Sequence, residues 1–289
     1  MMMLSKLVRF SLFRLVSFCS LFFLAPAIFG QSADKSKFEG YLFAYFEGTG
    51  KGEQQEQLRF AVSADAVNWT ALNENRPILA SADISQTGGI RDPHIYRGEN
   101  EDSFYMVATD MFTKKNGWDT NPGIVLMKSD DLLDWKHSIL DLAKLYPKKF
   151  GDVKWVWAPQ VFYDHKAGKY LVYFTVRFHD DDKLDFTGFE KEPTLLFSPK
   201  FGGIDGDIIY KDGLYHFFYK GNTKDAEGKE FKNGIQQATS KSLKGPWKED
   251  FKYLDAYADT SVVVEGSSVF KLNDSDEYIL MYDLYADGR

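Results

Sequence analysis

Three acidic residues stand where acid–base chemistry would need them, each at the opening of an apolar run typical of a strand. Asp92 occurs in IRDPHIY, Asp205 in GIDGDIIY and Glu265 in VVEGSSVF. A related stretch, WAPQVFY, carries Gln160 at about the same place. Carboxyl groups gathered at one apolar site have their pKa values driven apart, so one stays protonated while another is ionised. Hydrolysis of a glycosidic bond uses such a pair, because an acid protonates the leaving oxygen while a carboxylate activates water.

A single acid of this kind also has a simpler interpretation. Asp92 precedes a proline, and Asp before Pro is a common turn starter, so this stretch alone is consistent with ordinary turn chemistry. Three acids at corresponding points of a repeat favour a functional site instead. The sequence offers no serine elbow, HExxH stretch or phosphate-binding glycine loop as a competing chemistry.

The elements that must position these acids form a repeat of short strands. Each unit opens with a strand, a polar turn and an aromatic second strand, as in APQVFYDHKAGKYLVYFT and DGDIIYKDGLYHFFYK. Four of these hairpins share one tyrosine at the same place: Tyr105, Tyr170, Tyr215 and Tyr278. A later strand of three units leads into a tryptophan, namely Trp69, Trp135 and Trp247. We expect these tryptophans to pack between neighbouring sheets.

Units of about four short strands, recurring every 45 to 65 residues or so, are typical of a β-propeller. A fifth unit comes from residues 41–69, so the sequence predicts an all-β fold, a five-bladed β-propeller. No further strand pair follows the hairpin that ends in YDLYADGR, and the last blade is therefore expected to be incomplete. Because the first strand of each propeller blade lines the central channel, equivalent residues of these strands should converge at one mouth.

The first 30 residues have the layout of a secretory signal peptide. Three basic residues, Lys6, Arg9 and Arg14, precede the apolar segment LVSFCSLFFLAPAIFG, which ends in small residues. We therefore expect residues 1–30 to be removed on export and residues 31–289 to form one glycoside hydrolase domain, secreted or periplasmic. A retained N-terminal anchor is the alternative. Cys19, the only cysteine, lies in this segment, which excludes disulfides and thiol chemistry from the mature chain.

The charge of the mature chain argues against anionic partners. Residues 1–30 contain three basic and no acidic residues, so their removal changes the formal net charge from −7 to −10. An acidic exported protein without a basic stripe is a poor candidate for binding nucleic acid or an anionic membrane. The five histidines show no metal-ligand spacing, and HDDDKLD at residues 179–185 is interpreted as a solvated acidic loop. No metal and no cofactor is expected.

The region from about residue 40 to residue 289 resembles glycoside hydrolase family 43. The resemblance rests on four short motifs and their order along the chain: RDPHI, WAP, GGID and VEGS. The resemblance implies a five-bladed propeller that hydrolyses arabinosides, xylosides or galactosides with inversion of the anomeric centre. It further implies Asp92 as general base, Asp205 as the acid that positions and tunes, and Glu265 as general acid. The family often has proline after the middle acid, where this chain has Gly206. Asp207, two residues beyond Asp205 on the same expected strand face, is the alternative tuning acid.

Three further residues are candidates for sugar binding. Gln160 stands where many relatives carry an acid after WAP, and its amide can hydrogen-bond hydroxyl groups. Trp157, beside the expected channel, has a ring that could stack on a sugar, although a core position is an equal alternative. Trp118 lies in the polar loop KKNGWDTNPG, where an exposed aromatic side chain favours binding.

Two other functions fit parts of the pattern. A non-catalytic sugar-binding propeller would keep the fold and the aromatic contacts. A fructan- or sucrose-cleaving propeller also uses an RDP acid, but its nucleophilic aspartate belongs to a stretch like NDPNG in the preceding blade. The corresponding stretch here, YLFAYFEGTG, contains no aspartate. The favoured prediction is therefore an exported, inverting hydrolase of arabinofuranosyl, xylosyl or related galactosyl linkages, acting on plant-type polysaccharides or their oligosaccharides.

Overall fold

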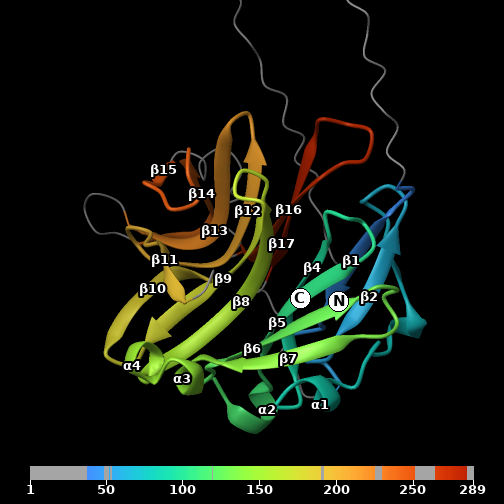
Figure 1. Ribbon diagram of the computed structural model, residues 1–289, viewed down its shortest axis with the longest axis horizontal. Coiled ribbons are helices and arrows are strands. Elements are labelled where there is room, and N and C mark those ends of the chain that lie inside the picture. Colours follow the sequence, from blue (N-terminus) through green and yellow to red (C-terminus); the bar gives the residue numbers. More distant parts are fainter. Residues whose placement is uncertain are drawn as a thin grey trace, which may run out of the picture.

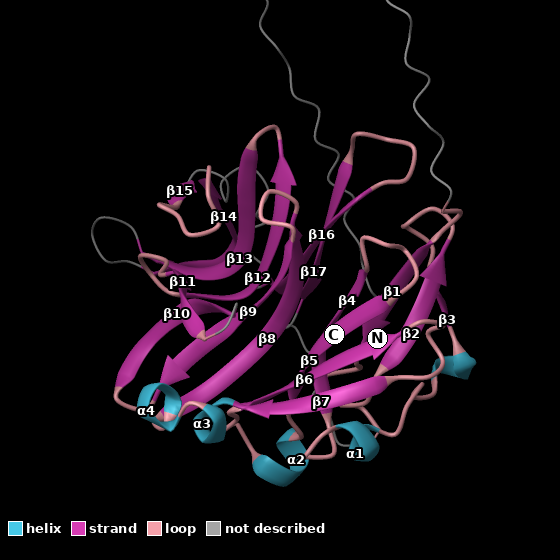
Figure 2. Cartoon of the chain, viewed as in Figure 1, coloured by secondary structure: helices cyan, strands magenta, loops and turns pink. Residues whose placement is uncertain are grey.

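The computed structural model describes residues 38–48, 52, 54–118, 120–189, 192–224, 230–250 and 264–284. Strands dominate this part of the chain (Figures 1 and 2). The helical segments described are short: η1 (Asn73–Asn75), α1 (Ser81–Ile84), α2 (Thr113–Asn116), α3 (Leu142–Leu145) and α4 (Pro147–Phe150). Within the same residues, no helix has the length and apolar character needed to span a membrane. The expected signal peptide, residues 1–30, lies outside the described residues.

The strands form five antiparallel sheets that follow the chain in order. The first sheet contains β1 (Tyr41–Tyr45), β2 (Arg59–Ser63) and β3 (Thr70–Ala71). The second contains β4 (Ile90–Arg97), β5 (Phe104–Asp110), β6 (Gly123–Ser129) and β7 (Lys136–Asp141). The third contains β8 (Val153–Asp164), β9 (Lys169–Phe178), β10 (Asp181–Phe189) and β11 (Pro193–Phe197). The fourth contains β12 (Gly203–Lys211), β13 (Leu214–Lys224), β14 (Glu230–Ser240) and β15 (Lys248–Asp250), and the fifth contains β16 (Val264–Lys271) and β17 (Tyr278–Leu284).

The repeated tyrosines all lie near the start of the second strand of a hairpin, as the sequence pattern predicts. Each of them pairs with a residue near the end of the preceding strand: Tyr105 with Tyr96, Tyr170 with Tyr163, Tyr215 with Tyr210, and Tyr278 with Lys271. The alternation of apolar and polar residues explains why these segments are strands, because side chains on successive residues point to opposite faces. The polar turn between each pair closes an antiparallel hairpin.

Apolar side chains from neighbouring sheets pack against each other and form the core. Tyr173 and Phe186 of the third sheet contact Phe217 of the fourth, with ring centroids 5.7 and 4.6 Å apart, and all three are almost fully buried. Trp247 also lies here, 5.6 Å from the ring of Phe197. Trp135 similarly packs at 6.3 Å against a phenylalanine of the first sheet. The prediction that these two repeated tryptophans lie between sheets is therefore confirmed.

The sheets are arranged around an axis as in a β-propeller. The first strands contact one another in succession, β1 with β4, β4 with β8, β8 with β12, and β12 with β16. The last hairpin also contacts the N-terminal segment through Asn273. Its backbone N–H donates to the Tyr41 hydroxyl at 2.7 Å, and its Nδ2 donates to the Phe38 carbonyl at 3.1 Å. The Tyr41 and Phe270 rings lie 5.7 Å apart across the same junction. The chain thus folds as an all-β propeller whose innermost strands surround a common axis.

Candidate active site

The first strands of four sheets share a β-bulge close to their N-terminal ends. In each, the register shifts by one residue and the backbone enters the left-handed region, at Asp92 (φ 49°), Ala158 (φ 45°), Asp205 (φ 55°) and Gly266 (φ 67°). A bulge of this kind turns a side chain away from the regular alternation of the strand, and bulges are frequent beside active sites. The four bulges therefore point residues of four different blades toward the propeller axis.

The register corrects one part of the sequence alignment. Asp92 and Asp205 do occupy equivalent positions, but Gly266 holds that position in β16, and Glu265 precedes it by one residue. In β8 the equivalent residue is Ala158 rather than Gln160. The assignment of Glu265 and Gln160 to the same position as the two aspartates is therefore wrong. An inserted bulge residue shifts which side chain faces the axis, and the sequence repeat does not mark where it is inserted.

A cavity of about 130 Å³ lies where these bulges meet. Residues from six strands or their ends surround it: Phe43, Ala44, Tyr45, Phe46, Asp92, Pro93, His94, Ala158, Pro159, Gln160, Asp205, Gly266, Ser267, Ser268 and Asp283. Two of the predicted acids, Asp92 and Asp205, line this cavity directly. The third, Glu265, is adjacent to the lining residue Gly266. The walls combine aromatic and carboxyl groups, which suits a ligand with both apolar faces and hydroxyl groups.

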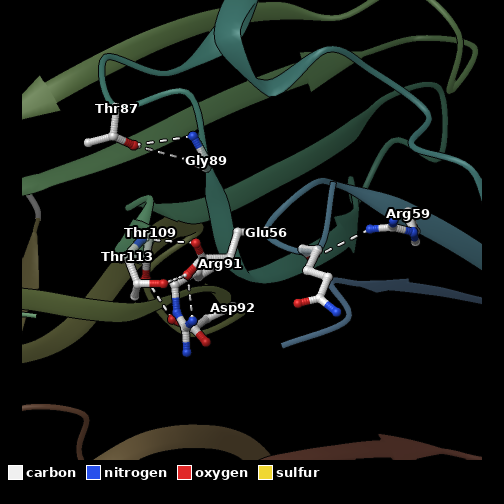
Figure 3. A network of polar contacts seen from close by, with 9 residues as sticks. Glu56, Arg59, Thr87, Gly89, Arg91, Asp92, Thr109 and Thr113 are labelled. Carbon is white, nitrogen blue, oxygen red and sulfur yellow. Dashed lines mark hydrogen bonds and ion pairs between the residues drawn. The ribbon is translucent and has the colours of Figure 1, made fainter. Parts of the chain in front are cut away.

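Asp92 is held by a contact between blades. The Thr109 hydroxyl donates to Oδ2 of Asp92 at 2.9 Å, and its oxygen accepts the backbone N–H of Ala158 at the same distance (Figure 3). Removal from water raises the pKa of Asp92, and the charge of Glu265 raises it further. The neighbouring Arg91 guanidinium and the hydrogen bonds act in the opposite direction. The carboxyl group of Asp92 is therefore fixed in position, and its pKa depends on the charge of Glu265.

Asp205 occupies the corresponding place in β12. Its Oδ2 accepts the backbone N–H of Gly266 at 3.0 Å, a contact that joins the fourth sheet to the fifth. Removal from water, followed by the charges of Asp92 and Glu265, raises the pKa of Asp205 to about 7. The charges of Asp92 and Glu265 therefore act on Asp205 across the axis. A carboxyl group with this pKa carries its proton over much of the acidic and neutral range.

Glu265 forms an ion pair. Its Oε2 lies 2.9 Å from Nζ of Lys220, whose side chain is 11% exposed, whereas the side chain of Glu265 is 33% exposed. Lys220 belongs to β13, so this contact again links the fourth sheet to the fifth. The ion pair therefore holds the carboxyl group of Glu265 against the side chain of Lys220 at the boundary between these two sheets.

Asp207 does not share the orientation of Asp205. It is buried, and its Oδ2 accepts the backbone N–H of Val269 between β12 and β16. Burial raises its pKa to about 7. The expectation that both residues face the same site is wrong, because Asp205 lines the cavity and Asp207 does not: the carboxyl group of Asp207 is taken up by its contact with the backbone of β16. Asp207 is thus a structural contact between sheets, and Asp205 is the aspartate of β12 that lines the cavity.

Gln160 and His94 occupy equivalent positions after their bulges, and both line the cavity. The Tyr173 hydroxyl donates to Oε1 of Gln160 at 2.8 Å and fixes the orientation of that side chain. The backbone N–H of Val161 donates to Nδ1 of His94 at 3.3 Å. Burial lowers the pKa of His94 to about 4, so the ring is neutral near pH 7 and carries its proton on Nε2. His94 can therefore donate one hydrogen bond to a ligand.

Trp118 and Trp157 do not line the cavity, but they belong to an aromatic group beside it. The guanidinium carbon of Arg91 lies 4.7 Å from the ring centroid of Phe46, a lining residue, and 4.8 Å from that of Trp118. The Trp118 ring contacts Trp157 at 5.9 Å, and Trp157 stacks on Trp155 at 4.1 Å. Trp118 remains 46% exposed. A chain of ring contacts therefore connects the lining residue Phe46, through Arg91, to these tryptophans.

Arg91 is anchored by a glutamate that the sequence analysis did not select. Its Nη1 lies 2.8 Å from Oε1 of the buried Glu56, which also accepts hydrogen bonds from the backbone N–H and the hydroxyl of Thr113, at 2.9 and 2.8 Å (Figure 3). This network fixes the residue next to Asp92. The loop that carries Glu56 has no repeat signal, so only its position in the fold reveals the contact.

Asp283 is a fourth acid at the cavity and was missed in the sequence. It lies in β17 and pairs with Glu265 across the last hairpin. An alignment of the second strands of the blades would have drawn attention to it, because Thr109 and Lys220, which contact the other acids, occupy the same register position.

Other parts of the described structure offer no comparable chemistry. A larger cavity of about 420 Å³ contains a single carboxylate, Asp164, among four lysines, namely Lys166, Lys169, Lys241 and Lys244. It therefore lacks the pair of carboxyl groups that glycoside hydrolysis needs. Among the described residues, no group of three or more His, Cys, Asp or Glu side chains is arranged to hold a metal ion.

The chain is thus a propeller with several interacting carboxyl groups at its axis, and comparison with known proteins identifies its family. The profile of a group related to glycoside hydrolase family 43, described as "Probable glycosyl hydrolase domain", matches residues 36–289. The chain belongs to this family. It is 24% identical over 290 residues to an α-L-arabinofuranosidase of Bifidobacterium longum subsp. longum, a match that covers 86% of this chain and 27% of the relative. The chain thus spans about a quarter of the length of that curated relative.

Solved structures show the same fold. An endo-arabinase from Bacteroides thetaiotaomicron matches with a TM-score of 0.60 and 16% identity, covering 85% of this chain and 88% of that one. An endo-1,4-β-xylanase from the same organism matches with a TM-score of 0.58 and 18% identity, covering 87% and 83%. At these identities the likeness establishes the fold alone.

Proposed function

We propose that this protein is an exported, inverting glycoside hydrolase that cleaves arabinofuranosyl, xylosyl or related galactosyl linkages in plant-type polysaccharides or oligosaccharides. The observation that carries the proposal is that Asp92 and Asp205, from two blades, line one cavity, while Glu265 of a third blade lies next to the lining residue Gly266 and acts electrostatically on both aspartates. Family membership and the arabinofuranosidase relative support the choice of sugars. We further propose that the five sheets correspond to five blades, the last of them incomplete.

In this mechanism Asp92 is the general base. Its carboxylate accepts a proton from a water molecule, which attacks the anomeric carbon, while Glu265 protonates the leaving oxygen on the opposite face of the sugar. Asp205 keeps Asp92 and Glu265 in position, and its own charge disfavours further negative charge between them. Inversion requires a carboxyl separation of roughly 6.5 to 9.5 Å, which leaves room for the water.

The test uses aryl α-L-arabinofuranosides, β-D-xylosides and β-D-galactosides with the wild-type protein, and NMR to determine the anomer released first. Asp92→Asn should reduce turnover by at least about a thousandfold while sugar binding and folding persist. Asp212→Asn is the matched control, because Asp212 also has a positive φ, of 51°, but lies in a hairpin turn. A near wild-type rate for Asp92→Asn would make Asp92 a turn residue and refute the mechanism.

A catalytically inert sugar-binding propeller is the competing outcome. It would bind the same sugars in calorimetry but release no product from any of them. A fructan-cleaving activity has less support, because the β1 residues at the cavity are Phe43, Ala44, Tyr45 and Phe46 and supply no nucleophilic carboxylate. Export remains a proposal based on residues 1–30. Mass spectrometry of the purified native protein should find an N-terminus near residue 31, and an intact N-terminus on cytoplasmic protein would refute it.

A further inference from the structure

One register position recurs in the second strand of four blades, opposite the residue that precedes each bulge. The residues at this position are Thr109, Thr175, Lys220 and Asp283. Two of them have defined polar partners in the site. Thr109 contacts Asp92 and the backbone of the next blade, and Lys220 contacts Glu265, also in the next blade. The position therefore holds groups that reach toward the axis and across to a neighbouring blade.

Asp283 has no such partner in the described part of the protein. It lines the cavity, and no described residue donates a hydrogen bond to its carboxyl group. A methyl group placed on Gly266 would lie 3.4 Å from Oδ2 of Asp283, so this oxygen lies directly beside the glycine whose N–H binds Asp205. The same cavity is lined by Phe43, Ala44 and Tyr45 of β1 and by Phe46, which follows that strand. The carboxyl group thus belongs to a cavity that contains both acids and aromatic rings.

We propose that Asp283 is a substrate-binding residue of this site, whose carboxyl group hydrogen-bonds hydroxyl groups of the sugar held between β1 and the bulges. The inference rests on the proposed glycosidase function and adds a determinant of which sugar is accepted. A carboxylate has two acceptor oxygens and can bind two neighbouring hydroxyl groups, which makes it sensitive to their configuration. A neutral side chain with free acceptor atoms would discriminate less strongly between sugars, because hydrogen bonds to charged groups are stronger.

The electrostatic surroundings agree with this role. Crowding by protein atoms, followed by the charges of Glu265 and Asp92, raises the pKa of Asp283 to about 6. The carboxyl group is nevertheless exposed at the cavity. A hydroxyl-bearing ligand would supply hydrogen bonds that the described protein does not provide, and these bonds would offset the repulsion from the other acids.

The test measures kcat/KM of Asp283→Asn on the aryl glycoside that the wild-type protein cleaves best and on its monodeoxy analogues. We expect a ten- to hundredfold loss of kcat/KM on the parent glycoside, as for removal of a charged hydrogen-bonding group. On the analogue that lacks the contacted hydroxyl, the variant and the wild-type protein should differ by no more than about twofold. Asp276→Asn is the matched control, because Asp276 lies in the turn of the same hairpin with its side chain 96% exposed.

Two results would overturn the proposal. One is a kcat/KM within about twofold of wild type for Asp283→Asn on the parent glycoside. The other is an equal loss on every deoxy analogue, which would mean that Asp283 acts through other residues. A second variant, Asp283→Ser, tests whether a loss seen for Asp283→Asn comes from a folding defect. Its thermal melting is compared with that of the control Asp276→Asn. If the wild-type protein cleaves no glycoside, the hydrolase function fails, and Asp283 is then judged by calorimetry: Asp283→Asn must weaken sugar binding where Asp276→Asn does not.

Discussion

Nζ of Lys220 lies 2.9 Å from Oε2 of Glu265, and this ion pair connects β13 with β16 across the boundary between two blades. The pair is close to the other acids, so the lysine charge also lowers the pKa of Asp205. Lys220 is thus the cation that offsets several carboxyl groups at the axis. Its contribution to stability and to activity can be separated experimentally.

Lys220→Met should lower the free energy of unfolding by about 1 to 3 kcal/mol, less than for a fully buried pair because Glu265 keeps some contact with water. Urea denaturation followed by tryptophan fluorescence measures this loss. Lys128→Met provides the control, because the Lys128–Asp130 pair has side chains 46% and 66% exposed and should contribute little. Equal losses in the two variants would show that the Lys220 pair is no stronger than a surface pair.

Thr109→Val removes a hydroxyl group that bridges two blades while preserving the shape of the side chain. The variant should lose about tenfold in kcat with little change in KM, because Asp92 loses the hydrogen bond that holds it in position. Thr175→Val is the matched control: Thr175 occupies the same register position in the third sheet, and its buried hydroxyl has no hydrogen-bond partner in the described structure. That control should be neutral or stabilising, and a comparable loss of kcat there would refute a specific role for Thr109.

The pKa of about 7 at Asp205 predicts how stability depends on pH. Because the folded state holds this proton more tightly than the unfolded state, whose Asp pKa is about 3.9, stability should fall as the pH rises from about 4 to 7. The decrease due to Asp205 is at most about 4 kcal/mol. Asp205→Asn should flatten this part of the curve when urea unfolding is measured at several pH values. An unchanged slope in the variant would contradict the assignment.

Trp118→Ala tests the aromatic surface beside the cavity. Because Trp118 is 46% exposed, the variant should fold with nearly wild-type stability. Affinity for an oligosaccharide should fall about tenfold, the scale of one lost aromatic contact, whereas the KM for a small aryl glycoside should stay the same. Leu133→Ala, at a residue 76% exposed in a distant turn, controls for the loss of exposed apolar surface. If the KM of the small substrate rises as much as that of the oligosaccharide, Trp118 acts within the cavity instead.

The repeat made much of this fold predictable. The tyrosine that recurs in each hairpin sets the register, and the register places Asp92, Asp205 and Glu265 near one axis. The bulges could not be predicted in the same way, because an extra residue in a strand leaves no mark in the apolar alternation. For this reason Asp207 was expected on the same face as Asp205. For the same reason Glu265 was aligned with Asp92, although Gly266, the next residue, holds the position equivalent to Asp92.

Residues outside the repeated motifs were also beyond sequence reasoning. Glu56 lies in a loop without regular pattern, and its contact with Arg91 depends on the packing of the first sheet against the second. Asp283 lies in the second strand of a hairpin, where the sequence pattern alone predicts that an acidic residue faces solvent. Both contacts join segments of different blades or strands, so they follow from tertiary structure rather than from local sequence.

The left-handed backbone at Asp92 and Asp205 has a consequence for engineering this protein. A non-glycine residue in that conformation costs about 1 kcal/mol or more relative to glycine, and Gly266 shows that glycine fits the same bulge in a neighbouring blade. Replacement of either aspartate by glycine would also remove a carboxyl group that burial disfavours in its charged form. Directed evolution for heat resistance alone would therefore tend to erase these two acids, so selection of thermostable variants has to include a screen for turnover.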